Sequence, residues 1–498
     1  MITNVISAID AIATATPNRW AYDVLGEKHT YGELKQAAET IALAIAQREL
    51  PEKAPIMVYC DQSFLTIATF LGCVKAGHAY IPVDTHSPQT RLRMIAEIAQ
   101  PAMVIAVAAL PVALDVPIAT AAELLNTPAV ANALLTPVVG ADTFYIIFTS
   151  GTTGQPKGVQ ISHDNLLSFV NWMVSFDWPK HPQTLSQAPY SFDLSVMSLY
   201  PALTLGGTLK VLPAATTADL KALFAALPTL DLQVWVSTPS FAAICLLEPT
   251  FNAAHYPQLT RFFFCGEELP HALAQELVRR FPQAQVYNTY GPTETTVAVT
   301  AVAITQSVLD QYDRLPIGQA KPDTRISLRA GSQRTDGDQA VGELMIAGPS
   351  VSKGYLNRPD KTAAAFLPAG YATGDLGFID DTGMLFYRGR TDFQIKLNGY
   401  RIELEEVSHY LNDESLIQQA VAVPKYGADH KVKQLLAYVV PAANDYPNEL
   451  ALTKALRQRL QAKMMAYMVP QRFIYRESLP LTTNGKVAIK ALIQEANA

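Results

Sequence analysis

The sequence predicts an α/β protein with a large N-terminal part and a smaller α+β part at its C-terminus. Helical and strand patterns alternate along the first part, which is typical of helices packed on a largely parallel sheet. Past residue 392 the pattern changes to a short strand and amphipathic helices. The length of 498 residues is enough for about three folding units. We place a boundary at Asp392, between a large domain over 1–392 and a small domain over 393–498.

Local signals assign the first elements. Thr30 and Glu33 form a capping-box pair at the start of a predicted helix. A second helix is predicted from Ser63 to a stop at Gly77, and a strand over 79–83 follows it. The apolar positions of the first helix recur at helical spacing: Leu34, Ala38, Ile41 and Ile45.

The small domain carries two helical patterns. Leu404, Val407 and Leu411 share one face of the first predicted helix. In the second helix the apolar residues recur every four positions: Leu452, Leu456, Leu460 and Met464.

Composition excludes several classes of protein. Apolar residues make up 49% of the chain and charged residues 16%, so the chain is not intrinsically disordered. The longest apolar run, over 102–114, contains a proline and is shorter than the roughly 20 residues that a membrane span needs. The N-terminus shows no signal-peptide pattern. We therefore expect a cytoplasmic protein without membrane insertion.

Charge and cysteines narrow the expectation further. The net charge of −6 argues against nucleic acid as a partner. The small domain carries 13 Lys and Arg against 10 Asp and Glu, a net +3, which fits either an acidic partner or an ordinary solvated surface. The cysteine spacing fits neither a disulfide framework nor a zinc site: Cys60, Cys73, Cys245 and Cys265.

The strongest motif is the segment over 149–158 (TSGTTGQPKG), which follows a strand-like run over 144–148. Its small residues let backbone amides close around phosphate oxygens, and Lys157 supplies a positive charge. It differs from the Walker pattern because Pro156 stands where that pattern needs glycine. Taken alone, the segment could also be a polar surface turn.

This segment closely resembles the signature of the adenylate-forming ligases, which include acyl-CoA synthetases, luciferases and the adenylation domains of non-ribosomal peptide synthesis. Further matches span nearly the whole chain in the expected order: 288–294 (NTYGPTE), 371–375 (YATGD), 388–392 (RGRTD), 394–403 (QIKLNGYRIE) and 484–486 (NGK). The resemblance implies the adenylate-forming ligase fold, a large N-terminal domain with helix-packed β-sheets and a small mobile α+β C-terminal domain.

The resemblance also implies ATP and Mg²⁺. Attack of a carboxylate on the α-phosphate of ATP brings negative charges together, so the site must offset charge and align the reactants. By resemblance, Glu294 holds Mg²⁺, Asp375 accepts the ribose hydroxyls and Tyr290 faces adenine. Lys157 and Lys486 are the expected catalytic residues, and Lys486 bridges the substrate carboxylate and the ATP oxygens. Further expected nucleotide contacts are Thr149, Ser150, Gly151, Thr152, Thr153, Gly154, Asn288, Thr289, Gly291, Pro292, Thr293 and Arg390.

Two segments suggest which acid is activated. Asp193, within 190–195 (YSFDLS), matches members in which an aspartate pairs with a substrate ammonium, although it also suits the N-cap of a following helix. The segment over 262–270 (FFFCGEELP) resembles members that load D-alanine onto a carrier protein for Gram-positive cell walls. In those members the cysteine lines the side-chain pocket, which places Cys265 there together with Gly266 and Val297. Cys265 also suits a plain buried position.

The expected function is a two-step ligase. D-alanine and ATP give D-alanyl adenylate, and the phosphopantetheine thiol of a D-alanyl carrier protein then takes the aminoacyl group for D-alanylation of teichoic acids. By resemblance, Asp392 is the hinge that swaps Lys486 out and brings in a thiolation segment with Lys396, Gly399 and Arg401. We expect a monomer.

Three alternatives stay open: an adenylating enzyme for glycine, L-alanine or D-serine, an acyl-CoA or aryl-acid ligase, and a non-catalytic relative. An acyl-CoA or aryl-acid ligase would need no acid at position 193. The joint presence of Lys157, Glu294, Asp375 and Lys486 speaks against a non-catalytic relative.

Overall fold

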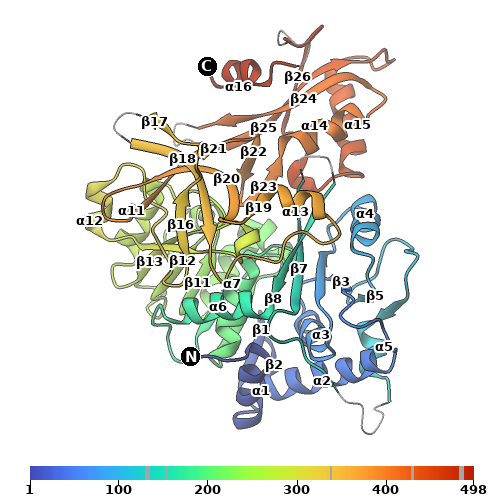
Figure 1. Cartoon of the computed structure of the whole chain (residues 1–498), viewed down its shortest axis with the longest axis vertical. Coiled ribbons are helices and arrows are strands. Elements are labelled where there is room, and N and C mark those ends of the chain that lie inside the picture. The colour runs from blue at the N-terminus through green and yellow to red at the C-terminus, as the bar shows by residue number, and fades with distance from the viewer. Residues whose placement is uncertain (129–134, 152–154, 337–338, 428–430, 482–486) are drawn as a thin grey trace. The chain divides into compact units, whose positions relative to one another are not determined.

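The computed structural model of the chain describes residues 1–128, 135–151, 155–336, 339–427, 431–481 and 487–498 (Figure 1). These residues form two compact units. Unit 1 consists of Met1–Thr85, Ala99–Ile147 and Gly158–Thr391. Unit 2 consists of His86–Ile98, Phe148–Lys157 and Asp392–Ala498, so two short segments from early in the chain group with its C-terminal residues.

A nine-stranded sheet is the largest element of unit 1. Its central strands, from β13 through β12, β11, β9 and β10 to β1, pair in parallel, and antiparallel pairs close both edges. In spatial order the strands are β15 (Gln319–Ala320), β14 (Thr300–Ala303), β13 (Gln285–Tyr290), β12 (Arg261–Phe264), β11 (Val234–Ser237), β9 (Gln183–Ser186), β10 (Thr208–Val211), β1 (Trp20–Val24) and β2 (Glu27–Thr30).

A six-stranded sheet carries the strand that leads into the predicted phosphate segment. The pairs among β6, β5, β3, β4 and β7 are parallel. In spatial order the strands are β6 (Ile118–Thr120), β5 (Met103–Ala106), β3 (Ile56–Cys60), β4 (Tyr80–Asp84), β7 (Thr143–Thr149) and β8 (Lys157–Ser162). The predicted largely parallel α/β fold is confirmed.

A third sheet of unit 1 is antiparallel and contains the predicted ribose segment in β20. Its strands are β16 (Arg325–Leu328), β17 (Arg334–Asp336), β18 (Gln339–Ala347), β19 (Phe366–Leu367), β20 (Gly370–Ile379) and β21 (Leu385–Arg390).

Helices cover the two large sheets, as Figure 1 shows. Those of unit 1 are α1 (Val5–Ala15), α2 (Tyr31–Ala46), α3 (Phe64–Lys75), α5 (Ala121–Leu125), α6 (His163–Val174), α7 (Leu194–Thr204), α8 (Ala214–Ala218), α9 (Leu220–Ala226), α10 (Pro239–Cys245), α11 (His271–Arg280), α12 (Gln306–Gln311) and α13 (Pro359–Ala365). Short 3₁₀ turns lie at η1 (Leu227–Leu230) and η2 (Thr293–Thr295).

The predicted elements of unit 1 are present. Helix α2 has Thr30 as its N-cap, and both hydrogen bonds of the capping box with Glu33 are made. Helix α3 starts after Ser63, and Gly77 beyond its end has φ of +89°, a conformation that glycine adopts at no steric cost. The predicted strand over 79–83 is β4, shifted by one residue.

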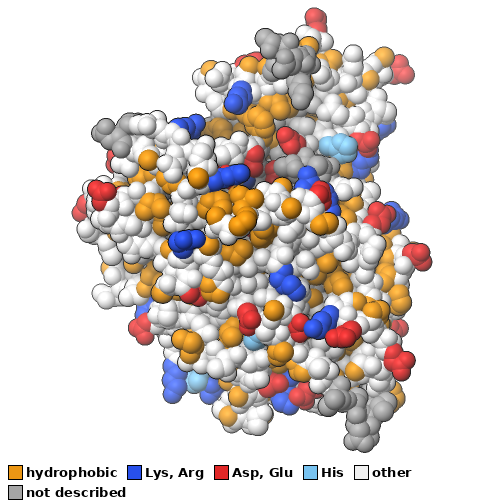
Figure 2. Space-filling view, viewed as in Figure 1, with side chains coloured by type: hydrophobic (Ala, Val, Ile, Leu, Met, Phe, Trp, Pro, Cys, Tyr) orange, Lys and Arg blue, Asp and Glu red, His pale blue; other side chains and the backbone are white. Residues whose placement is uncertain are grey.

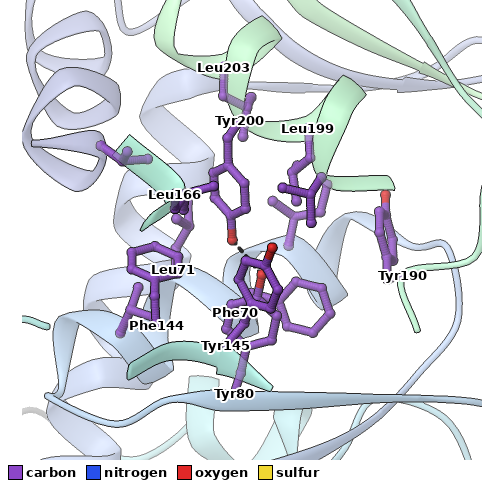
Figure 3. Packing of buried hydrophobic residues seen from close by; sticks show 14 of the residues in the cluster. Phe70, Leu71, Tyr80, Phe144, Tyr145, Leu166, Tyr190, Leu199, Tyr200 and Leu203 are labelled. Atoms are coloured by element: carbon purple, nitrogen blue, oxygen red, sulfur yellow. Dashed lines mark hydrogen bonds between the residues drawn. The ribbon is translucent and has the colours of Figure 1, made fainter. Parts of the chain in front are cut away.

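A buried cluster of aromatic residues fixes helix α7 against strands β4 and β7 (Figure 3). The hydroxyl groups of Tyr80 and Tyr200 are 2.6 Å apart and hydrogen-bonded, and Phe144 meets Tyr200 edge-on at a centroid distance of 5.5 Å. Phe70 stacks on Tyr80 at 4.1 Å. Because such pairs are directional, they orient α7, whose N-cap residue is Asp193, within unit 1.

Unit 2 is an α+β structure, drawn in orange and red in Figure 1 for its C-terminal part. Strands β24 (Ile417–Tyr426) and β25 (Val432–Pro441) are antiparallel, and β26 (Arg472–Tyr475) pairs with β25 in parallel. Successive residues of these strands belong to two different buried clusters, as the period of two requires. The remaining elements are β22 (Gln394–Leu397), β23 (Tyr400–Glu403), α4 (Gln89–Ala99), α14 (Leu404–Asn412), α15 (Glu449–Gln461), η3 (Ala466–Met468) and α16 (Ile489–Asn497).

Each face of the β24–β25 pair is covered by helices. Leu404, Val407 and Leu411 of α14 join one cluster, which confirms the predicted helix face. The second predicted helix is wrong at its end, because α15 stops at Gln461, before Met464. Met464 is nevertheless buried in the same cluster. Its backbone amide still donates to the carbonyl of Leu460 at 2.9 Å, so the chain keeps a helix-like turn up to this residue. The apolar spacing therefore predicted correctly that Met464 is buried, but not that the helix ends before it.

The face of the molecule that Figure 2 draws is mixed in charge. On the face drawn in Figure 2, Lys and Arg side chains alternate with Asp and Glu and do not merge into one basic patch. Among the described residues, no helix combines the length and the apolar character that crossing a bilayer requires.

Candidate active site

The predicted adenine and magnesium segment forms the turn after β13. Gly291 is required there, because a Cβ atom would lie 2.6 Å from the Cα of Ala298. Thr296 and Val297 follow with φ of 60° and 67°, a region that β-branched residues rarely adopt. Strain of this kind persists only where the surroundings hold it, and here the Thr296 hydroxyl donates to the carbonyl of Ser350 at 2.7 Å.

Other residues of this segment hold the turn in place. The Asn288 amide donates to the carbonyl of Pro316 at 2.7 Å, and the Thr289 hydroxyl donates to the carbonyl of Phe264 at 2.8 Å. Both polar groups are thus used within the protein. These two side-chain hydrogen bonds hold the end of β13 in place.

Tyr290, Asp375 and Arg390 come together from three strands. The Tyr290 hydroxyl and the Arg390 guanidinium each donate to one carboxylate oxygen of Asp375, both at 2.6 Å. Tyr290 and Asp375 are buried, and the Arg390 side chain is 9% exposed. Burial together with the charge of Asp375 raises the pKa of Tyr290 well above its ordinary value. Each carboxylate oxygen keeps a further lone pair, so Asp375 can still accept hydroxyl groups of a ligand.

Glu294 lies in the turn η2 with its carboxylate fully buried. One of its oxygens, Oε1, accepts a hydrogen bond of 2.8 Å from the hydroxyl of Tyr355. Sequence reasoning did not single out Tyr355, because a lone tyrosine in a Gly-Tyr pair carries no signal of its own.

Cys265, Gly266 and Val297 form a second group. Cys265 follows β12 and is buried, and its sulfur lies 3.7 Å from the carbonyl oxygen of Val297. Gly266 continues the chain at φ of 91°. Leu194, the residue after Asp193, belongs to the same buried cluster as Cys265 and Val297.

Asp193 sits at the N-cap position of α7 but does not cap the helix. Its backbone is helical, with φ of −64° and ψ of −21°, and its side chain makes no hydrogen bond to the first amides. A capping residue has extended backbone angles and accepts from the second or third amide. The Asp193 charge acts instead on the buried hydroxyl of Tyr145, whose pKa is raised mainly by burial and further by Asp193.

The predicted phosphate segment starts at the end of β7. Thr149, Ser150, Gly151 and Lys157 are described, whereas Thr152, Thr153 and Gly154 lie outside the described residues. Gly151 is required, because a Cβ atom there would lie 2.1 Å from the carbonyl oxygen of Gln155. Thr149 keeps a buried hydroxyl without a hydrogen-bond partner among the described residues.

Within unit 2 this segment contacts β23 and α14. The Ser150 hydroxyl donates to the carbonyl of Arg401 at 2.9 Å, and the Gly151 amide donates to Oε2 of Glu406 at 3.2 Å. Arg91 of α4 lies 3.8 Å from the other oxygen of Glu406. An amide that donates to Glu406 cannot serve a phosphate oxygen at the same moment. Sequence reasoning missed Glu406, because it looks like one more charge in an acidic helix start.

The predicted thiolation residues lie on the β22–β23 hairpin. Asn398 and Gly399 form its two-residue turn, with φ of 52° and 85°, as a type I′ hairpin requires. Lys396 and Arg401 are cross-strand partners, and Arg401 donates to the side chain of Gln394 at 2.7 Å. Asp392 accepts a hydrogen bond of 3.1 Å from the Gln394 amide. Lys486 lies outside the described residues, and the hinge role of Asp392 stays a prediction.

The carboxyl of Glu406 is expected to make stability fall as pH rises. Burial raises the pKa of Glu406 to about 7, although Arg91 and the Gly151 amide oppose this shift. The folded chain therefore holds this proton after the unfolded chain has lost it, so the free energy of unfolding decreases from about pH 4.5 to pH 7 by a few kcal/mol. Glu406→Gln does not titrate and is expected to gain stability over the wild type by about that amount between pH 5 and pH 8.

Urea denaturation at several pH values in that range measures the difference. Glu405→Gln is the matched control, because Glu405 is the exposed neighbour in the same helix. If the wild type and Glu406→Gln keep a constant difference across the range, Glu406 does not titrate as described.

Comparison with known proteins agrees with this fold. The family model for AMP-binding enzymes matches residues 9–356, and the model for the C-terminal domain of AMP-binding enzymes matches residues 406–486. The chain belongs to the AMP-binding enzyme family. Within it, the chain belongs with the D-alanine–D-alanyl carrier protein ligases.

The named relatives match over their full length. The chain is 58% identical to the D-alanine–D-alanyl carrier protein ligase of Lactiplantibacillus plantarum, with 100% of each chain covered. It is 50% identical to the enzyme of the same name from Streptococcus pneumoniae, with 100% of this chain and 99% of the relative covered.

Solved structures share the fold. The o-succinylbenzoate CoA synthetase of Bacillus subtilis matches with a TM-score of 0.85 at 19% identity, covering 98% of both chains. The Vibrio cholerae adenylation domain AlmE, solved with glycyl-adenosine-5′-phosphate, matches with a TM-score of 0.80 at 24% identity, covering 99% of this chain and 98% of that one. The predicted adenylate-forming fold is confirmed.

Proposed function

We propose that this chain activates D-alanine with ATP and transfers it to a D-alanyl carrier protein. In the first step a carboxylate oxygen of D-alanine attacks the α-phosphorus of ATP and pyrophosphate leaves. In the second step the phosphopantetheine sulfur attacks the acyl carbon, AMP leaves and the thiol proton is released. The full-length similarity to ligases of this name, at 50–58% identity, carries the proposal.

The nucleotide site of the proposal is built on the Tyr290–Asp375–Arg390 group. Asp375 accepts the ribose hydroxyls with the lone pairs that its two partners leave unused, and the ring of Tyr290 faces the adenine. Arg390 pairs with the buried carboxylate of Asp375 at 2.6 Å, and this ion pair offsets part of the cost of burying the charge. Thr149, Ser150 and Lys157 are assigned to the phosphates.

Mg²⁺ fits the donor set around Glu294. The described residues contain no group of three or more acidic, His or Cys side chains that could enclose a metal ion. Mg²⁺ commonly binds through one or two carboxylates and completes its shell with substrate phosphates and water. Glu294 offers one carboxylate of this kind, and a bound Mg²⁺ would offset phosphate charge as pyrophosphate leaves.

The amino-acid site is assigned to Asp193, Cys265, Gly266 and Val297. We assign the Asp193 carboxylate to the substrate ammonium, with which it would form a charge-assisted hydrogen bond. Its side chain makes no capping bond to the first amides of α7. Cys265 against the Val297 carbonyl forms a small buried wall, which suits a methyl side chain. Glycine, L-alanine and D-serine remain competitors that these contacts do not exclude by size.

The second step is assigned to the small C-terminal region. Gly399 and its neighbours Lys396 and Arg401 are proposed to line the path of the phosphopantetheine arm after rotation at Asp392. The product would supply D-alanine for teichoic acids. A cytoplasmic location and a monomeric state stay predictions.

Substrate-dependent pyrophosphate exchange tests the proposal. D-alanine, L-alanine, glycine, D-serine and one aryl acid are compared at equal concentration, followed by thioester formation on a phosphopantetheinylated carrier. D-alanine is expected to give the highest kcat/KM. Exchange that depends on the aryl acid instead would support the acyl-CoA or aryl-acid ligase alternative, and no exchange with any acid would contradict the adenylation step.

Cys265→Ala is expected to weaken discrimination between the alanine enantiomers. With the ammonium on Asp193 and the carboxylate at the α-phosphate, exchanging the enantiomers redirects the methyl group, which would meet the sulfur. A difference of this size in a pocket corresponds to about 1–3 kcal/mol, so the preference for D-alanine should fall by roughly tenfold. The ratio of kcat/KM for the two enantiomers measures it.

Cys245→Ala is the matched control, because Cys245 is also a buried cysteine but belongs to another cluster. An equal loss of activity with both enantiomers in Cys265→Ala would indicate packing damage and not a role in selectivity.

A further inference from the structure

A short strap, defined here as residues 352–356, connects the turn that carries Glu294 to strand β8. At one end the Ser352 amide donates to the carbonyl of Glu294 at 2.9 Å. At the other end the Leu356 amide donates to the carbonyl of Gly158 at 2.8 Å. Tyr355 lies within the strap and pairs with Val159 as an isolated antiparallel bridge. The strap therefore joins the metal-binding turn of the proposed site to the strand that begins at Lys157.

The side chain of Tyr355 is held on several sides. It is buried, and its ring meets Phe366 edge-on at 5.5 Å. Its backbone amide donates to the hydroxyl of Thr362 at 3.0 Å. A ring fixed in this way has one available direction for its hydroxyl, and that hydroxyl donates to Oε1 of Glu294.

A hydrogen-bond donor such as the Tyr355 hydroxyl stabilises the Glu294 carboxylate. Its carboxylate is fully buried, and a buried charge without hydrogen bonds is strongly unfavourable. A carboxylate also rotates easily about its last side-chain bond, because that torsion has broad minima. A donor on Oε1 restricts this rotation and thereby also restricts the direction of Oε2.

We propose that Tyr355 is a positioning residue for the metal site. It fixes Oε1 of Glu294 so that Oε2 is presented to the Mg²⁺ of Mg·ATP. The inference rests on the proposed function and deepens it. Partners that orient a metal ligand in this way typically change metal affinity 10- to 100-fold when they are removed.

Tyr355→Phe tests the role, because it keeps the ring and removes only the hydroxyl. Binding of Mn²⁺ to the enzyme–ATP complex is measured by electron paramagnetic resonance, without amino acid. We expect about tenfold weaker Mn²⁺ binding, together with a raised KM for the metal–ATP complex. The KM for D-alanine should stay within about twofold of the wild type, equivalent to roughly 0.4 kcal/mol.

Tyr256→Phe is the matched control. Tyr256 is also buried, but its hydroxyl has no hydrogen-bond partner among the described residues and its ring lies in a different cluster. A general effect of losing a buried hydroxyl would appear in both variants. An effect on Mn²⁺ binding should appear only in Tyr355→Phe.

The double variant separates positioning from simple stability. In a Glu294→Gln background, Tyr355→Phe should weaken Mn²⁺ binding by less than twofold, because the carboxylate that it orients is absent. If Tyr355→Phe fails to fold, Glu294→Asp keeps the charge but withdraws the carboxylate from Tyr355, and the same tenfold loss is expected. Mn²⁺ binding within twofold of the wild type, or equal effects in both backgrounds, would overturn the proposal.

These outcomes differ from a failure of the proposed function. If the chain activates another acid, pyrophosphate exchange with D-alanine is absent in the wild type, while the Mn²⁺–ATP measurement still reports on Tyr355.

Discussion

Asp193→Asn is expected to raise the KM for D-alanine by about 30-fold or more while leaving the KM for ATP nearly unchanged. Removing one partner of a desolvated charge pair costs about 2–5 kcal/mol, because the other charge stays buried without compensation. The amide of asparagine has nearly the same shape as the carboxylate, so packing at the start of α7 is preserved. Steady-state pyrophosphate exchange at varied D-alanine and varied ATP measures both constants.

The structure makes a control for this variant available. Asp219 caps α9 by accepting hydrogen bonds from the amides of Lys221 and Ala222, at 2.8 and 3.2 Å. Replacing a capping residue by alanine costs about 1 kcal/mol, so Asp219→Ala should lose stability for this reason, whereas Asp193→Ala removes no capping bond. If Asp193→Asn leaves the KM for D-alanine unchanged and Asp193→Ala lowers the free energy of unfolding, Asp193 has a structural role only.

Lys486→Ala is expected to lower pyrophosphate exchange by at least about a hundredfold, because one oriented donor to developing charge contributes about 10²–10³ in rate. Lys486 lies outside the described residues, so this prediction follows from its position in the 484–486 motif and from the chemistry of the step. Transfer from supplied D-alanyl adenylate to the carrier should stay within about twofold, roughly 0.4 kcal/mol in barrier. The two half-reactions are measured separately.

Lys490→Ala is the matched control, because it removes the same charge from an exposed position in α16, four residues further on. It should change neither half-reaction. If transfer from the adenylate falls as far as exchange in Lys486→Ala, the proposed division of labour between the two steps is wrong.

Local sequence signals predicted a helix or strand correctly where one short segment contains all the interacting residues. The capping box of Thr30 and Glu33 is an example, because both partners and the helix start lie within four residues. The apolar spacing of α14 likewise reported its buried face. The predicted end of the helix α15 was wrong, because Met464 is buried although it lies beyond the last helical residue, Gln461.

Contacts between distant residues needed the tertiary structure. The sequence predicts a nucleotide contact for each of Tyr290, Asp375 and Arg390. It does not predict that Asp375 accepts hydrogen bonds from the other two. Those bonds require the pairing of β20 with β21 and the approach of β13 from the nine-stranded sheet. Glu406 and Tyr355 carry no motif signal, and their roles depend on partners more than 60 residues away in sequence.

The family, the order of its motifs and the residue types that adenylation chemistry requires could be predicted from the sequence, because each motif is a local pattern of small, charged and aromatic residues. The pairing of Asp193 with a substrate ammonium stays a proposal. The tertiary structure was needed to show that the Asp193 side chain does not cap α7, since capping depends on backbone angles and on a hydrogen bond to the first amides that this side chain does not make. It also decided the environment of Glu294 and Glu406, because burial and hydrogen-bond partners arise only when separate segments pack together.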